Sequence, residues 1–298
     1  MKEWIRAMRL RTLPLSLAGV LLGIMLAASE GYTNATISIL VIITAVLLQI
    51  LSNLANDYGD FIKGTDNENR VGPLRSVQSG KISASQMKMA IKATAALALA
   101  TGLIMLWLAF SNDRLYLFGV YLLLGLTAIW AAIRYTTGES AYGYKGLGDL
   151  FVFVFFGLIS VVGTYSLFSP FFNELIFYPA SAIGFLSVGV LNLNNTRDIV
   201  NDKESGKMTI AVKLGFDAAR NYQVYLFLAA MAFALVYSVS IEAGYFKYLY
   251  IIGLAPLLMV ILRTKKATKP SELEPLLKIQ ALGTLLFALL MGMGTLLN

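Results

Sequence analysis

Long runs of apolar residues are separated by polar connections along the whole chain. About nine of these runs approach the roughly 20 mainly apolar residues that a helix needs to cross a bilayer. They cover residues 13–28, 35–54, 89–110, 115–133, 150–168, 175–193, 222–241, 246–262 and 279–297. Each run is continuously apolar, whereas the strands of a membrane barrel alternate apolar and polar positions. The pattern predicts an all-α, polytopic membrane protein with one domain over residues 1–298 and a bundle of about nine transmembrane helices.

The composition supports a membrane location and narrows the chemistry. Hydrophobic residues make up 57% of the chain and charged residues 14%, whereas a soluble domain carries about a quarter charged residues. Cysteine and histidine are both absent from the sequence, which excludes thiolate and imidazole ligands and an imidazole base. The net charge of +7 would suggest nucleic acid binding in a soluble protein. Basic cytoplasmic loops explain it here, so we expect no nucleic acid partner.

Basic residues fall almost entirely on one side of the predicted membrane. Only Arg114 and Lys247 belong to connections on the other side. This asymmetry predicts a multi-pass protein of the cell inner (cytoplasmic) membrane, with a cytoplasmic N-terminus and an external C-terminus. Two cytoplasmic connections, 55–88 and 194–220, are long and rich in charge. Long loops on a rigid scaffold commonly carry function, so we expect the site there.

The first of these connections begins with an acidic cluster. Asn53, Asn56, Asp57 and Asp60 are spaced at i, i+3, i+4 and i+7, and Asp66 follows. If the second transmembrane helix continues through this segment, the first four side chains form one polar face at its cytoplasmic end.

A second acidic cluster follows the sixth predicted helix. Asn194, Asp198 and Asp202 recur at i, i+4 and i+8, with Asn195 beside them. Both clusters therefore stand at helix ends on the same side of the membrane, and we expect them to face one another.

Clustered carboxylates repel one another unless a cation lies between them, and Mg²⁺ takes carboxylate and phosphate oxygens as ligands. The candidate metal-site residues are Asn56, Asp57, Asp60, Asp66, Asp198 and Asp202, and the candidate catalytic residues among them are Asp60, Asp198 and Asp202. Basic side chains that could bind a diphosphate follow both clusters: Lys63, Arg70, Arg75 and Lys207. The two clusters thus predict a site for a diphosphate held with Mg²⁺ as the cofactor.

Two other interpretations compete with this one. The clusters could be solvated charges that cap two helices, although their recurrence on one side disfavours this. The protein could also be a membrane transporter, because polar residues in transmembrane segments often line transport pathways. The centres of the predicted helices, however, hold almost no ionisable residues. Charge at one face and apolar helices behind it favour an enzyme that acts on an amphiphile.

On its first acidic motif, the chain resembles the UbiA-type intramembrane prenyltransferases. The first aspartate motif of this family, Asn-Asp-x-x-Asp-x-x-x-Asp, is matched at Asn56, Asp57 and Asp60. Gly64 stands at the third aspartate position, and Asp66 follows two residues later.

The second family motif, Asp-x-x-x-Asp, is matched by Asp198 and Asp202, so the resemblance covers the whole chain. It implies an Mg²⁺-dependent transfer of a polyprenyl group from polyprenyl diphosphate to an aromatic acceptor within the lipid bilayer. It implies no obligate protein partner.

Further stretches resemble the branch of the family that uses 1,4-dihydroxy-2-naphthoate in menaquinone biosynthesis. These stretches are 9–14, 56–66, 72–75 with 78–80, 143–149 and 194–198. The resemblance implies 1,4-dihydroxy-2-naphthoate as the acceptor, loss of its carboxylate, and demethylmenaquinone as the product. Another acceptor of the family, such as 4-hydroxybenzoate or homogentisate, stays an alternative.

The acceptor site is the part that the motifs define least. The family's Tyr-x-x-x-Lys element is not matched, because Tyr135 is followed at that spacing by Glu139. A carboxylate acceptor beside a diphosphate needs additional cationic groups, since two anions repel strongly in a partly dry cavity. Arg134, Tyr135 and Lys145 are the candidate acceptor-binding residues.

Overall fold

The computed structural model describes residues 1–67, 71–110, 114–139 and 141–297. Arg70, a predicted diphosphate ligand, therefore lies outside the described residues. Within the described part of the chain, nine helical spans are long and apolar enough to cross a membrane. The prediction of an all-α membrane bundle is confirmed.

The spans and their connections are assembled from α-helices, a π-helix (η3) and 3-10 helices (the other η elements). In chain order they are α1 (Lys2–Met8), η1 (Leu10–Thr12), α2 (Leu13–Ser29), α3 (Ala35–Ile62), α4 (Ala84–Phe110), α5 (Leu115–Arg134), η2 (Tyr142–Lys145), α6 (Gly148–Val152), η3 (Phe153–Gly163), α7 (Thr164–Phe168), η4 (Glu174–Ile176), α8 (Phe177–Arg197), α9 (Ile199–Glu204), α10 (Ile210–Leu214), α11 (Phe216–Ser240), η5 (Tyr245–Gly253), α12 (Leu254–Lys266), η6 (Pro270–Leu273) and α13 (Glu274–Leu296).

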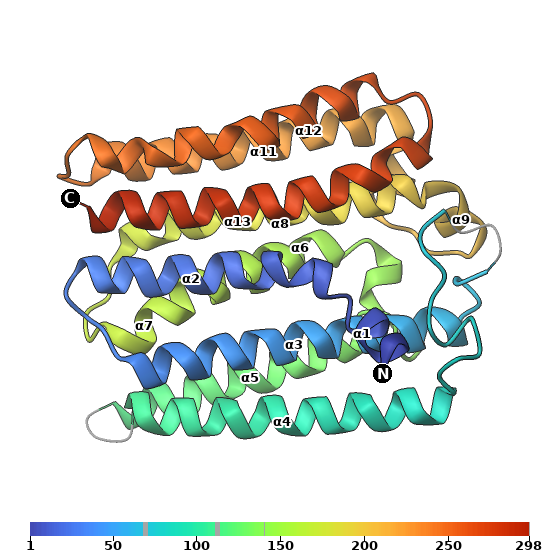
Figure 1. Cartoon of the computed structure of the whole chain (residues 1–298), viewed down its shortest axis with the longest axis horizontal. Helices are drawn as coiled ribbons and strands as arrows, with labels where there is room; N and C mark the ends of the chain where they lie inside the picture. Colours follow the sequence, from blue (N-terminus) through green and yellow to red (C-terminus); the bar gives the residue numbers. More distant parts are fainter. Residues whose placement is uncertain (68–70, 111–113, 140, 298) are drawn as a thin grey trace.

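The helices run alongside one another, with α3, α4 and α5 on one side of α2 and with α11 and α12 beyond α8 and α13 (Figure 1). The largest buried cluster joins α2, the η3 segment, α8 and the last three spans, and Leu22, Ile183 and Phe287 are among its members. Smaller clusters hold α3 and α4 together. The two termini lie at opposite ends of the bundle (Figure 1), as an odd number of spans requires.

Glycines fix the η3 segment against its neighbours. A Cβ on Gly157 would lie 2.6 Å from the Cα of Gly184 in α8, and a Cβ on Gly19 in α2 would lie 2.3 Å from the Oγ of Ser160. Small residues of this kind let helix backbones approach closely in a membrane. The η3 segment is therefore clamped on the side that faces α2 and α8.

The opposite side of η3 is much less constrained. In the described residues, α5 packs mainly against α3 and α4 and makes only marginal contact with η3. The hydroxyl of Tyr121 in α5 donates a hydrogen bond to the carbonyl of Gly163 over 3.3 Å. A cavity lies between these two elements, and the functional residues gather at one end of it.

Candidate active site

The first acidic motif occupies the last turns of α3. The helix continues to Ile62, beyond the apolar run that predicted it, so the polar residues that follow the run stay on its surface. Asp57 is buried, and its carboxylate accepts hydrogen bonds from the backbone N–H groups of Ser76 (3.2 Å) and Val77 (3.3 Å). Asp57 therefore anchors the loop that carries Arg75.

Arg75 brings two carboxylates of the motif together. Its Nη2 lies 3.0 Å from Oδ2 of Asp60, and its Nε lies 3.1 Å from Oδ1 of Asp66. Both aspartates are buried and the Arg75 side chain is only 9% exposed, so the interaction is weakly screened by water. The structure thus places Asp66, which departs from the family spacing, beside Asp60.

A tight turn explains how Asp66 returns to the helix. Gly64 has a φ of +72°, a left-handed conformation that glycine adopts without steric cost. The backbone N–H groups of Thr65 and Asp66 then both donate to the carbonyl of Asp60, over 3.0 and 3.3 Å. A glycine at the third aspartate position of the motif therefore serves to place a later aspartate in the site.

The second acidic motif lies at the end of α8 and in α9. Asp198 pairs with its neighbour Arg197, whose Nε lies 2.9 Å from Oδ1 of the aspartate. Asp202 is buried and its Oδ1 lies 3.4 Å from Nζ of Lys207. Asn201 donates a hydrogen bond over 2.9 Å to the carbonyl of Thr65, which ties the second motif directly to the first.

The electrostatics show that the two motifs share one site. Burial is the largest cause that raises the pKa of Asp202, the charges of Asp198 and Asp60 also raise it and Lys207 lowers it, and together they bring the pKa to about 6. Burial disfavours the charge of Lys207, but the carboxylates of Asp202 and Asp60 outweigh it and raise the pKa of Lys207. Lys207 therefore stays protonated between the two motifs at neutral pH.

Tyr144 occupies the centre of the site, a role that the acidic motifs do not reveal. Its hydroxyl donates to Oδ1 of Asp60 over 2.9 Å and lies 2.6 Å from the hydroxyl of Thr65. Nζ of Lys63 lies 4.1 Å above its ring, and Nζ of Lys207 lies 5.7 Å from the ring centre. Burial lowers the pKa of Lys63 and the nearby charge of Asp60 opposes this shift. The 143–149 stretch, which resembles the naphthoate branch, was the available sequence signal.

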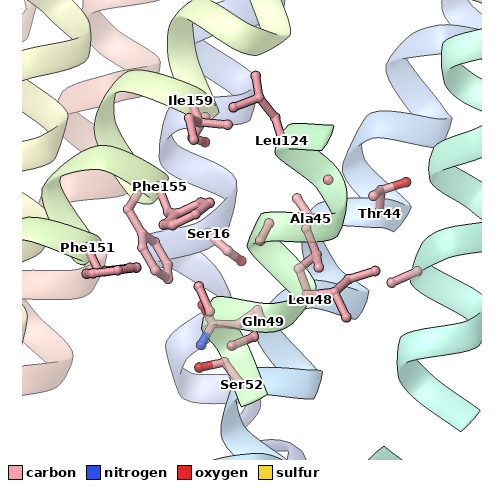
Figure 2. Close-up of a pocket in the computed structure, with 18 of the residues that line it drawn as sticks. Ser16, Thr44, Ala45, Leu48, Gln49, Ser52, Leu124, Phe151, Phe155 and Ile159 are labelled. Carbon is pink, nitrogen blue, oxygen red and sulfur yellow. The ribbon is translucent and has the colours of Figure 1, made fainter. Parts of the chain in front are cut away.

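An elongated cavity of about 350 Å³ extends from this charged end into the bundle. Its polar end is lined by Asn56, Asp60, Arg75, Asn194 and Lys207. Its remaining walls are mostly apolar. Figure 2 shows Phe151, Phe155 and Ile159 facing α3 and α5 across the space. The shape and polarity suit an amphiphile with an anionic head and an apolar chain.

The predicted acceptor residues do not all meet at the cavity. Tyr135 lines it, close to Lys207, and burial raises the pKa of its hydroxyl. Arg134 and Lys145 are exposed and do not contribute to the cavity lining. The structure therefore places one of the three candidates next to the polar end of the cavity.

The oxygen donors of the site fit a hard divalent cation that arrives with a phosphate ligand. In the described residues, no three carboxylates converge as a ready-made metal cage. Oδ2 of Asp202 and Oδ1 of Asn201 are nevertheless buried without a hydrogen-bond partner among the described residues. Because Mg²⁺ is usually held by one or two carboxylates plus substrate phosphates, these residues and Asp60 fit the ion.

Residues 16–296 match the UbiA prenyltransferase family, and the chain belongs to this family of enzymes. The fold agrees. A UbiA homolog from Aeropyrum pernix K1 superposes with a TM-score of 0.68 at 16% identity, covering 98% of this chain and 97% of that one. A UbiA homolog from Archaeoglobus fulgidus, bound to DMAPP and Mg²⁺, superposes with a TM-score of 0.63 at 18% identity, covering 97% and 99%.

Several sequence relatives carry a more specific name, 1,4-dihydroxy-2-naphthoate octaprenyltransferase. The protein from Escherichia coli (strain K12) is 40% identical over 298 residues, which cover 100% of this chain and 96% of the relative. The protein from Haemophilus influenzae is 39% identical over 302 residues, with coverage of 100% and 97%. The protein from Mycobacterium tuberculosis is 35% identical over 293 residues, with coverage of 96% and 94%.

Proposed function

We propose that this protein transfers a polyprenyl group from polyprenyl diphosphate to 1,4-dihydroxy-2-naphthoate, with loss of the carboxylate as carbon dioxide and release of diphosphate, to give demethylmenaquinol, the reduced form of demethylmenaquinone. The observation that carries this proposal is the full-length similarity, at 35% to 40% identity, to proteins named for that acceptor. A cavity with a charged end and apolar walls supports a polyprenyl diphosphate as the other substrate.

Asp60 and Asp202, with Asp198 next to them, would hold Mg²⁺ against the diphosphate, and the bound ion would neutralise part of the charge that develops on the leaving group. Arg75 and Lys207 line the cavity and would turn from their carboxylate partners toward phosphate oxygens. Lys63 adds a further positive charge beside Tyr144.

The apolar walls supply the second part of the mechanism. Breaking the C–O bond of an allylic diphosphate leaves a carbocation that water would capture. The mainly apolar walls of the cavity would exclude water from this region, and the rings of Phe151 and Phe155, which line it, would stabilise a cation. The ring carbon of the acceptor then forms the new C–C bond, and the carboxylate leaves from that carbon with its bonding electron pair left in the ring.

The acceptor would lie on the Tyr135 side of the polar end. Tyr135 is the candidate whose side chain lines the cavity, and its raised pKa keeps the hydroxyl protonated as a hydrogen-bond donor or acceptor. Arg134 and Lys145 remain proposed cationic groups for the carboxylate of the acceptor, at the exposed edge of the site.

The direct test is a prenyl-transfer assay with the purified protein in lipid vesicles. We expect demethylmenaquinol to form from 1,4-dihydroxy-2-naphthoate in the presence of Mg²⁺, and the reaction to stop when EDTA removes the ion and to resume when Mg²⁺ is restored. Turnover after complete chelation would contradict the diphosphate site. A preference for 4-hydroxybenzoate or homogentisate would replace the acceptor and leave prenyl transfer intact.

A second expectation concerns orientation in the membrane. The nearly complete segregation of lysine and arginine supports a cytoplasmic N-terminus, a cytoplasmic active site and an external C-terminus in the inner membrane. A reporter that is active only outside the cytoplasm should be active when fused after Asn298. A matched fusion after Lys269, in the connection between the last two spans, should be inactive. The reverse pattern would invert the proposed orientation.

A further inference from the structure

We propose that Arg197 is a positioning residue that fixes Asp198 and Asn194 of the active site, and that Glu274, at the start of α13, holds Arg197 in place. The functional importance of this arrangement rests on the proposed function, because Asp198 matters to catalysis only if the site binds a diphosphate with Mg²⁺. The residues involved come from the end of α8 and the start of α13, which are distant in the sequence.

Arg197 is among the largest fully buried side chains of the protein, with a relative exposure of 1%. All three of its nitrogen groups are used inside the protein. Nε and Nη2 form a fork with the carboxylate of Asp198, Nη2 also donates to Oδ1 of Asn194 over 2.9 Å, and Nη1 donates to Oε2 of Glu274. A bidentate arginine pair of this kind fixes the plane of the carboxylate.

The other cations of the site are placed differently. Arg75 and Lys207 also pair with aspartates, but both contribute to the wall of the cavity, whereas Arg197 does not. Arg75 and Lys207 can therefore reach a diphosphate in the cavity by changing partners. Arg197 directs its donors at Asp198, Asn194 and Glu274 and does not line the cavity, so we assign it as a support and not as a phosphate ligand.

The contact with Asn194 has a consequence for the cavity. The guanidinium group is only a donor, so the amide oxygen of Asn194 must face Arg197. The amide nitrogen, with its two donor hydrogens, is then left for the cavity, which Asn194 lines. Arg197 thereby sets the orientation of two groups, one carboxylate and one amide donor.

Glu274 balances the charge of Arg197 and ties it to the rest of the bundle. It stands in the first turn of α13, where the helix dipole favours a carboxylate. Its Oε1 also accepts a hydrogen bond from Nη1 of Arg11, over 3.1 Å, at the entrance to α2. Removing the charge of Glu274 would leave the guanidinium group with Asp198 as its one carboxylate partner in the described residues, and the fork would shift.

The test compares Glu274→Gln with Glu272→Gln, a matched control. Glu272 lies in η6, is exposed, and bonds to Thr268 in the same connection. The first measurement needs no turnover: the rise in melting temperature of the protein in vesicles or detergent when Mg²⁺ and inorganic pyrophosphate are added. The second is the Mg²⁺ concentration that gives half the maximal rate of prenyl transfer.

We expect Glu274→Gln to raise the half-maximal Mg²⁺ concentration about 10-fold, the lower end of what loss of an outer-shell partner costs, and to reduce the pyrophosphate-dependent stabilisation. Glu272→Gln should behave like the wild type, and Glu274→Asp should restore part of the Mg²⁺ affinity. If Glu274 acts through Arg197, then Arg197→Gln combined with Glu274→Gln should be no worse than Arg197→Gln alone.

Two results would overturn the positioning role. One is a Glu274→Gln protein that melts at a lower temperature but keeps the wild-type response to Mg²⁺ and pyrophosphate, because that variant would reveal a purely structural contact. The other is an Arg197→Lys protein with a raised KM for the prenyl diphosphate and an unchanged Mg²⁺ dependence, which would make Arg197 a phosphate ligand. A wild-type protein that pyrophosphate and Mg²⁺ do not stabilise would instead contradict the proposed function itself.

Discussion

Replacing Asp202 with asparagine should lower the rate of prenyl transfer by about 10²- to 10³-fold, the range seen when one preorganised electrostatic group is removed from an active site. The carboxylate is buried between the two motifs, and its Oδ2 has no hydrogen-bond partner among the described residues. Asparagine keeps the size of the side chain but not the charge that would hold Mg²⁺ against the diphosphate. Initial rates at saturating Mg²⁺ measure the loss.

Asp217→Asn provides the matched control. Asp217 stands at the start of α11, is exposed, and pairs only with Arg220 in the described residues. Exposed ion pairs contribute about 0–1 kcal/mol, so this variant should keep nearly full activity. If Asp202→Asn were as active as Asp217→Asn, with both proteins equally folded in detergent, the buried carboxylate would be a structural cap and the metal assignment would fall.

Replacing Gly125 with phenylalanine should impair long prenyl substrates much more than short ones. Gly125 lines the cavity on α5, and a Cβ placed on it would meet no atom within 4 Å. A phenyl ring there would occupy cavity space along α5, where we propose that the apolar chain of the substrate lies. With a long chain also in the cavity the added ring overfills it, which costs about 1–3 kcal/mol, so we expect a roughly 10- to 100-fold loss of kcat/KM with a long polyprenyl diphosphate. Dimethylallyl diphosphate should react almost as with the wild type.

Gly119→Phe is the control for this change. Gly119 lies on the same helix, also has open space around an added Cβ, and is exposed outside the cavity lining. A ring there should face lipid and leave both substrates unaffected. An equal loss for short and long substrates in Gly125→Phe would mean that the ring disturbs the polar end of the site, and the proposed path of the chain along α5 would be wrong.

The transmembrane architecture could be predicted from the sequence because a bilayer demands long apolar runs, and these runs are the strongest signal in a chain. The ends of the helices were less accurate. The second span continues to Ile62 and the third begins at Ala84, although the apolar runs end at 54 and begin at 89. Polar turns that extend out of the bilayer are still helical, but they carry no hydrophobic signal.

The acidic face of α3 could also be predicted, since its spacing is a local helical property. The contact between Arg75 and both Asp60 and Asp66 could not, because it depends on a loop that closes back onto the helix through Asp57 and on the left-handed turn at Gly64. The contact of Tyr144 with Asp60 could not be predicted either, because it arises from the packing of a segment that is distant in the sequence. The assignments of site residues to metal, phosphate and acceptor stay predictions.

The loose contact between α5 and η3 has a consequence for how this protein meets its substrate. The wall of the cavity formed by α5 belongs to a helix on which Ala131 is the one buried residue, and every other residue of that helix is at least partly exposed. Under the proposed function, a prenyl chain that follows this wall would extend sideways into the surrounding lipid while its diphosphate stays at the polar end of the cavity. The concentration of prenyl diphosphate that determines the rate would then be its mole fraction among the lipids of the membrane, and not its amount per volume of solution. Adding inert lipid at a constant total amount of prenyl diphosphate would lower this mole fraction. Saturation curves measured at different lipid contents would therefore coincide only when the rate is plotted against the mole fraction of the substrate.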